Sequence, residues 1–137
     1  MGQDSVAEFL KYENKYAILL ALTSNEGSND FQIPNELYLD VVSKSQSWDD
    51  SSKIMYVVGA TKSDYLKKIR NIAKDNFLLI PGIGAQGGDF EQTIANSKLS
   101  SKRILINISR AIIYASNDKN YLDSSEKVVD EFNLRSL

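Results

Sequence analysis

Four short apolar segments stand out along the chain, and turn-forming residues follow each of them. The segments are Ala17–Leu22, Ile54–Val58, Phe77–Ile80 and Arg103–Ile108. Their apolar residues are nearly continuous, a pattern typical of strands that are buried on both faces in a parallel sheet. Periodicity alone would also allow a buried helix for the Leu- and Ala-rich first segment, but the turn-forming run 23–29 behind it favours a strand.

One helical pattern precedes the first apolar segment, and one follows each of the four segments. Apolar residues three or four positions apart predict helices at Val6–Leu10, Leu37–Val42, Leu66–Ala73, Phe90–Ile94 and Val128–Phe132. Stretches 26–33 and 45–53 are predicted to be loops. The alternation of strands and helices is typical of parallel strands joined by right-handed crossovers, so we expect an α/β fold.

Capping residues indicate where several of these helices should begin. The candidate first residues or caps are Asp4, Ser63 or Asp64, and Asp89. Asp123 and Glu126 have the spacing of a capping box, with Asp in place of the usual Ser or Thr. These signals predict the starts of all helices but the second.

Composition limits the size and the class of the protein. The chain has 137 residues, of which 42% are apolar and 25% charged, so we expect a packed core within one domain or part of a larger one. No linker or change of composition divides residues 1–137, which we predict to form a single unit. A net charge of −2 gives no long-range attraction to nucleic acid or to an anionic membrane.

The complete lack of Cys and His excludes several chemistries. The chain cannot form disulfides, Cys/His zinc sites, thiolate nucleophiles or a Ser-His-Asp triad. Acid–base catalysis would have to use carboxylates, Lys, Tyr or bound water. Lack of Cys is compatible with a reducing cytosol, and the N-terminus does not have the pattern of a signal peptide, so we expect a cytoplasmic protein. No apolar run approaches the roughly 20 residues that span a bilayer.

Ligands of parallel strand–helix proteins bind beyond the carboxyl ends of the strands, so the segments that follow the apolar runs are the candidates. These segments are 23–28, 59–61, 81–89 and 109–112. Five of the seven glycines, Gly59 and the four from Gly82 to Gly88, follow the second and third apolar runs. Glycine after a strand lets backbone N–H groups approach an anion closely.

A phosphate site is the favoured interpretation of two neighbouring segments. Gln86 offers an amide donor, and Arg110, at the end of the next strand, can bind phosphate in a bidentate manner. In the alternative, the glycines only make a tight turn and Arg110 pairs with a surface carboxylate. The Gly-Lys-Ser/Thr of a Walker loop is absent, and Gly82-x-Gly84-x-x-Gly87 is a weak match to the dinucleotide motif.

Ser24 and a group of basic residues each allow a functional and a structural interpretation. Ser24 could bind a polar ligand edge, or it could form an ST-turn or helix cap, with equal support from the residues alone. The basic residues Lys62, Lys67, Lys68 and Arg70 are expected to form the solvated face of a helix. They lack interleaved aromatic residues, which argues against a nucleic-acid interface.

Taken together, these segments resemble the orotidine 5'-phosphate decarboxylase family, in its longer-chain bacterial and apicomplexan branch. The matching segments are Leu22-Thr-Ser-Asn-x-Gly-Ser28, Asp30-Phe-Gln32, Val57-Val-Gly-Ala-Thr61, Ile80-Pro-Gly-Ile-Gly-Ala-Gln-Gly-Gly-Asp89, Ile106-Asn-Ile-Ser-Arg-Ala-Ile112 and Tyr114-Ala-Ser116. They span about residues 1–116 in the family's order. Glu26 departs from the branch, which often has Pro there.

The resemblance implies specific roles for the matched residues. Ser24 would contact the pyrimidine ring and Pro81 would lie against the base. Gln86 and Arg110, with the nearby Gly87 and Ser109, would hold the 5'-phosphate. The ligands would be orotidine and uridine 5'-monophosphate, and neither a metal nor an organic cofactor would be needed. The implied fold is a (βα)8 TIM barrel, whose members are usually homodimers.

The resemblance also exposes what this chain lacks. The family's chemistry depends on Asp-x-Lys-x-x-Asp after an early strand, and no Asp-x-Lys occurs anywhere in the sequence. The segments correspond to the C-terminal half of the barrel, from strand 5 to helix 8 and preceded by one helix, which would make Met1 an internal methionine of a longer enzyme. We therefore expect no catalytic residues here, and no decarboxylation by this chain alone.

The sequence is compatible with three hypotheses for such a chain. It could be half of the decarboxylase, acting with an N-terminal half-barrel or a full-length copy. It could be a truncated or engineered non-catalytic half-barrel that self-associates to cover its strand edges. A third, weaker reading is another phosphate-binding barrel enzyme, against which the contexts of Ser24 and of Ser109-Arg110 argue.

Overall fold

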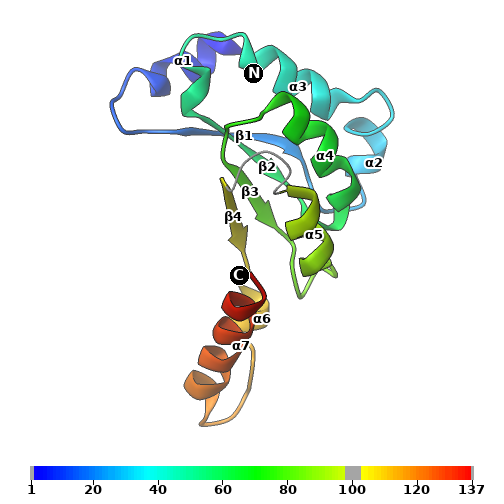
Figure 1. Cartoon of the computed structure of the whole chain (residues 1–137), viewed down its shortest axis with the longest axis vertical. Helices are drawn as coiled ribbons and strands as arrows, with labels where there is room; N and C mark the ends of the chain where they lie inside the picture. The colour runs from blue at the N-terminus through cyan, green and yellow to red at the C-terminus, as the bar shows by residue number, and fades with distance from the viewer. Residues whose placement is uncertain (1, 98–102, 137) are drawn as a thin grey trace.

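Four parallel strands form one sheet and follow one another across it in chain order (Figure 1). The computed structural model describes residues 2–97 and 103–136, so Met1 lies outside the described residues. The strands are β1 (Ala17–Leu22), β2 (Ile54–Val58), β3 (Leu78–Pro81) and β4 (Ile104–Asn107). All four predicted strands are present, and each pairs in parallel with its neighbour in the sequence. The α/β prediction is confirmed.

Every predicted helix is present, together with short helical segments that the periodicity did not indicate. The helices are α1 (Gln3–Leu10), α2 (Ser28–Phe31), α3 (Leu37–Gln46), α4 (Ser63–Ile72), α5 (Phe90–Ser97), α6 (Arg110–Ile113) and α7 (Tyr121–Ser136), with 3-10 turns η1 (Ser51–Lys53) and η2 (Ala60–Lys62). The loop predictions for 26–33 and 45–53 are wrong in part, because they contain α2, the end of α3 and η1. A single turn is too short to show amphipathic periodicity.

The predicted helix starts are confirmed at α4 and α5 but not at the two ends of the chain. α4 begins at Ser63, and Asp89 caps α5 by accepting the N–H of Gln92 at 2.8 Å. Asp4 is not a cap, because α1 begins at Gln3 and places it inside the first turn. The capping box that starts at Asp123 is also wrong, because α7 already begins at Tyr121.

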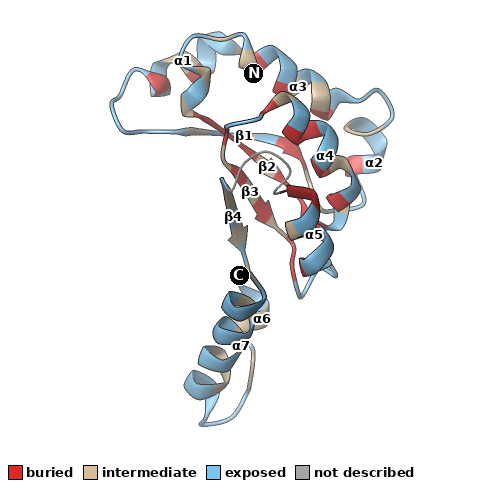
Figure 2. Cartoon of the chain, viewed as in Figure 1, coloured by how far each residue is buried: buried red, intermediate tan, exposed pale blue. Residues whose placement is uncertain are grey.

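The sheet has one covered and one open face. Figure 2 shows buried residues in β1, β2 and β3 and in α3 to α5, whereas α6 and α7 are mainly exposed. On the covered face, Ile54, Tyr56 and Leu78 are completely buried in the core. On the open face, register aligns one apolar row across all four strands. This row consists of Leu20, Val57, Leu79 and Leu105. Its outer members are 56% and 45% exposed, so the prediction of burial on both faces fails for β1 and β4.

The C-terminal helices leave the sheet and contact it only in part. α6 and α7 extend beyond the end of β4 (Figure 1). The last turns of α7 return to α5, where the Phe132 and Phe90 rings lie 5.4 Å apart between centroids. Arg135 stacks on Phe90 at 5.0 Å and pairs with Glu91 at 2.9 Å. These contacts place the segment after β4 beside the segment after β3.

The prediction that Arg70 belongs to a solvated basic face is wrong, because its side chain is completely buried. It follows Leu66 by four residues and precedes Ala73 by three, so it belongs to the apolar stripe of α4. Burial lowers the pKa of its guanidinium from the ordinary value. The guanidinium donates to five carbonyl groups at 2.8 to 3.4 Å, those of Ala73, Lys74, Asn76, Ser97 and Arg103. One side chain thus joins the ends of α4 and α5 to the starts of β3 and β4.

Replacing Arg70 by Met should destabilise the fold, because the buried carbonyl groups would lose their donor. We expect the Arg70→Met variant to lose about 3 kcal/mol of unfolding free energy. Urea denaturation followed by circular dichroism measures this change. Lys67→Met is the matched control, since Lys67 is an exposed cation on the same helix. Equal stability of the two variants would contradict this account of Arg70.

Candidate functional site

Loops from β1 and β3 meet beyond the carboxyl ends of the strands. The Ser24 hydroxyl donates to Oε1 of Gln86 at 2.5 Å, although the two residues are 62 positions apart in sequence. Ser24 follows the end of β1, and Gln86 lies in the glycine-rich segment after β3. The Ser24 side chain therefore bridges two loops instead of capping its own turn. Two predicted site residues are brought into direct contact.

The loop after β2 packs tightly against Ser24. A Cβ atom at Gly59 would lie 2.5 Å from both the backbone N and the Cα of Ser24. Thr61 donates its hydroxyl to the carbonyl oxygen of Ser24 at 2.7 Å. Because Gly59 has an ordinary φ of −63°, it is close approach and not a left-handed conformation that requires glycine there. Ser24 is thus held from β2 as well as from β3.

The glycine-rich segment folds into a closed turn. The N–H of Gly88 donates to the carbonyl of Gly82 at 3.0 Å, and Gly82 has a φ of +104° that disfavours a side chain. Gly84 approaches the start of α6, because a Cβ placed on it would lie 3.0 Å from Cβ of Ala111. Gly87 faces open space, with no atom within 4 Å of a Cβ placed there. The turn therefore lies beside the residue that follows Arg110.

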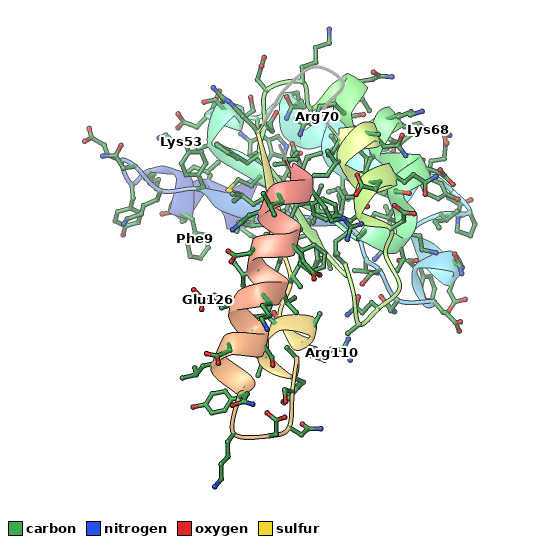
Figure 3. The ribbon with its side chains drawn as sticks, turned by 60° about the horizontal axis from the view of Figure 1, so that its bottom comes forward. Phe9, Lys53, Lys68, Arg70, Arg110 and Glu126 are labelled. Carbon is green, nitrogen blue, oxygen red and sulfur yellow. The ribbon has the colours of Figure 1, made fainter. Side chains whose placement is uncertain are left out.

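Arg110 begins α6 and is exposed. In Figure 3 it extends from α6, whereas Arg70 lies at the opposite ends of the strands. Within residues 2–97 and 103–136, no carboxylate pairs with the Arg110 guanidinium. The alternative in which Arg110 pairs with a surface carboxylate is therefore not seen there. The cation is available to an anion beside the glycine-rich turn.

Pro81 and Ser109 complete the set of predicted residues at this edge of the sheet. Pro81 is the last residue of β3 and lies opposite Asn107 of β4. Ser109 donates its hydroxyl to Oδ1 of Asn107 at 3.0 Å. The structure thus places five of the six predicted binding residues on loops or strand ends at one edge, and the sixth, Arg110, at the start of α6. Their direct mutual contact is the hydrogen bond between Ser24 and Gln86.

The arrangement supplies hydrogen-bond donors and the cation of Arg110. Among the described residues, no group of three carboxylates could hold a metal ion. Sequence reasoning missed Gln32, whose side chain accepts from both the N–H and the hydroxyl of Thr23. It also gave no role to Thr61. Both residues lie in the matched motifs, but only the folded loops bring them to Ser24.

Comparison with known proteins identifies the family. Residues 1–124 match the sequence model of the Orotidine 5'-phosphate decarboxylase / HUMPS family. The chain belongs to the orotidine 5'-phosphate decarboxylase / HUMPS family. The orotidine 5'-phosphate decarboxylase of Christiangramia forsetii is 51% identical over 127 residues, which cover 90% of this chain and 47% of the relative. That of Flavobacterium johnsoniae is 48% identical over 131 residues, covering 93% of this chain and 48% of the relative.

Solved structures of orotidine 5'-phosphate decarboxylases have the same fold. Leishmania donovani OMP decarboxylase superposes with a TM-score of 0.78 at 29% identity, covering 99% of this chain and 54% of that one. The Methanocaldococcus jannaschii enzyme, complexed with the inhibitor BMP, gives a TM-score of 0.70 at 26% identity, covering 96% of this chain and 57% of that one. The four strands and their helices are therefore a half barrel. The chain spans about half the length of the curated relatives it matches.

The described part of the chain has no helix long and apolar enough to cross a membrane. The longest helix, α7, carries charged residues throughout its 16 positions. This finding agrees with the absence of a long apolar run in the sequence.

Replacing Gly59 by Ala should displace Ser24, because a methyl group has no room against the backbone of the β1 loop. We expect the Gly59→Ala variant to lose about 2 kcal/mol of unfolding free energy, as overpacked sites do. Thermal and urea unfolding measure the loss. Gly2→Ala serves as the control, since a Cβ there would meet only the flexible side chain of Asp4. A Gly59→Ala variant as stable as Gly2→Ala would show that the two loops are not in close contact.

Proposed function

We propose that this chain is the phosphate- and pyrimidine-binding half of an orotidine 5'-phosphate decarboxylase, which converts orotidine 5'-monophosphate to uridine 5'-monophosphate and CO2. The observation that carries the proposal is the position of Gln86. Its side chain accepts a hydrogen bond from Ser24, and it lies in the same turn as Gly84, which approaches the start of α6. The printed names of the relatives and the family match support the same reaction.

The phosphate would be bound by Gln86, Arg110 and Gly87. Because Oε1 of Gln86 accepts from Ser24, the amide NH2 is turned toward other acceptors and is free to donate to phosphate oxygens. Arg110 supplies a planar guanidinium that can bind two phosphate oxygens at once. Gly87 leaves space beside them. Ser109, next to Arg110, orients the end of the last strand through Asn107.

The pyrimidine would lie between the ends of β1 and β3. Ser24 offers its hydroxyl and backbone to the polar edge of the base, while Pro81 offers an apolar surface at the end of β3. Since Ser24 also contacts Gln86, the base site and the phosphate site share one hydrogen bond. Binding of phosphate would therefore be coupled to the position of the base, so that remote binding energy is used at the reacting carbon.

The reaction itself needs groups from elsewhere. Breaking the bond between C6 and the carboxylate leaves an electron pair on C6 and releases CO2, and C6 must then take up a proton. A carboxylate beside the substrate carboxylate and a Lys that donates the proton would perform these steps, as the family resemblance implies. The sequence has no Asp-x-Lys-x-x-Asp, so the catalytic set would come from another polypeptide segment. No cofactor is required in this scheme.

The partner would be an N-terminal half-barrel, or a full-length copy that supplies one. The row of Leu20, Val57, Leu79 and Leu105 crosses the open face, and in closed barrels such rows are buried by side chains from the other strands. Among the described strands, β1 and β4 each pair on one side only, so two edges are available for pairing. Four additional strands would cover the row and both edges at once.

A self-associated, non-catalytic half-barrel is the second candidate. The same open face and edges favour it, since two copies could pair into a closed ring of strands. Light scattering of the purified chain distinguishes the candidates when it is repeated with the N-terminal half of a relative. A dimer that the added half does not dissociate supports self-association, and a one-to-one complex supports the enzyme half.

The isolated chain should not form uridine 5'-monophosphate from orotidine 5'-monophosphate, because it lacks the carboxylate and Lys groups that act on C6. Addition of a polypeptide that carries Asp-x-Lys-x-x-Asp should restore turnover. A spectrophotometric assay of substrate loss measures both. Turnover by this chain alone, at the rate of a full-length relative, would refute the division of roles.

Replacing Arg110 by Ala should weaken phosphate-bearing ligands by about 2–4 kcal/mol, since a charge partner of the phosphate would be lost. Calorimetric titration of the reconstituted protein with uridine 5'-monophosphate and with uridine measures the effect. Affinity for uridine, which has no phosphate, should stay the same. Lys119→Ala, an exposed cation in the loop between α6 and α7, is the control. Unchanged affinity in Arg110→Ala would reject the assignment.

A further inference from the structure

We propose that Gln32 and Thr61 are positioning residues that hold Ser24 in place and, through Ser24, set the orientation of the Gln86 amide. The inference rests on the proposed function, because it explains how the proposed phosphate donor is aligned. Gln32 and Thr61 are not among the residues proposed to contact the ligand. Their effect would be transmitted by hydrogen bonds to the backbone at positions 23 and 24.

Gln32 fixes the residue that precedes Ser24. Its Oε1 accepts two hydrogen bonds from Thr23, from the backbone N–H at 2.8 Å and from the hydroxyl at 3.2 Å. Gln32 follows the single turn of α2, whose N–H groups bond within the loop after β1. Because Thr23 is the first residue after β1, the Gln32 oxygen supplies the partner that a strand ladder would otherwise give to the Thr23 N–H. The loop after β1 is thus closed on itself through one side chain.

Thr61 fixes Ser24 from the neighbouring strand. Its hydroxyl donates to the Ser24 carbonyl at 2.7 Å, while the N–H of Gly59 donates to the Leu22 carbonyl at 2.8 Å. The close approach of Gly59 to the Ser24 backbone prevents movement toward β2. Thr61 therefore holds the peptide group that follows the Cα of Ser24, and Gln32 holds the peptide group that precedes the Cα of Thr23, one residue earlier.

The consequence for Gln86 follows from the direction of its hydrogen bond. The Ser24 hydroxyl donates to Oε1, so it selects the orientation in which the Gln86 NH2 points away from Ser24. A shift of the Ser24 backbone would break this bond and leave the Gln86 amide free to rotate. Gly82 lies close to both side chains, since a Cβ placed there would be 3.0 Å from Oε1 of Gln86 and 3.3 Å from Cβ of Ser24.

Two matched pairs of variants separate positioning from general stability. Gln32→Met removes the acceptor at similar size, and Gln32→Glu keeps an acceptor oxygen. Thr61→Val removes the donor at the same shape, and Thr61→Ser keeps it. The side-chain NH2 resonances of Gln86 in the ¹⁵N-labelled full chain are the readout without any ligand, assigned by their loss in Gln86→Met. Ser24→Ala defines their position when the bond is absent.

We expect the Gln86 resonances of Gln32→Met and Thr61→Val to move toward the Ser24→Ala position. Gln32→Glu and Thr61→Ser should keep the wild-type position. A merely structural role would lower unfolding stability and leave these resonances unmoved, and that result would overturn the proposal. If one of the two disruptive variants fails to fold, the other pair decides by the same criterion.

Titration with uridine 5'-monophosphate then connects positioning to binding. The Thr61 pair is used here, since neither substitution changes the charge near the phosphate. Thr61→Val should raise the Kd about tenfold, as expected for one lost hydrogen bond, and it should have no further effect when Ser24 is already Ala. If the reconstituted wild-type protein binds no uridine 5'-monophosphate, the proposed function fails, while the resonance positions still decide whether Gln32 and Thr61 orient Gln86.

Discussion

Parallel hydrogen bonding between consecutive strands is the constraint on which the rest of this structure depends. Because β1 to β4 run in the same direction and in chain order, every segment that follows a strand lies at one edge of the sheet. Ser24 and Gln86 meet there although 62 positions separate them. At the other edge, the five carbonyl groups around Arg70 hold the starts of β3 and β4 beside the ends of two helices.

The same register leaves half of a barrel open. One row of side chains is buried under the helices, while the next row crosses four strands with its outer leucines exposed. The division of the fold corresponds to the proposed division of the chemistry. The groups proposed to bind phosphate and base lie at the ends of these four strands, and the sequence contains no Asp-x-Lys that could act on a carboxylate. Binding energy and bond cleavage would then come from different halves of one enzyme.

Much of this arrangement could be predicted from local sequence, and the failures have specific causes. Continuous apolar runs located all four strands, and Asp89 correctly indicated the start of α5. Single-turn helices such as α2 and α6 were missed, because four residues cover one helical turn and the apolar spacing cannot repeat within them. Arg70 was assigned to solvent by its charge, although its spacing from Leu66 and Ala73 placed it on the buried stripe of α4.

The sequence by itself determined the fold class, the family and the residues of the candidate site. It could do so because strand burial and glycine-rich turns leave short-range patterns, and because the motif from Ile80 to Asp89 is highly specific. Only the tertiary structure decided which of these residues touch. The bonds of Ser24 to Thr61 and to Gln86 join separate loops, and the bond of Thr23 to Gln32 closes the loop after β1 on itself. Strand register and close packing select these partners, and no local pattern encodes them.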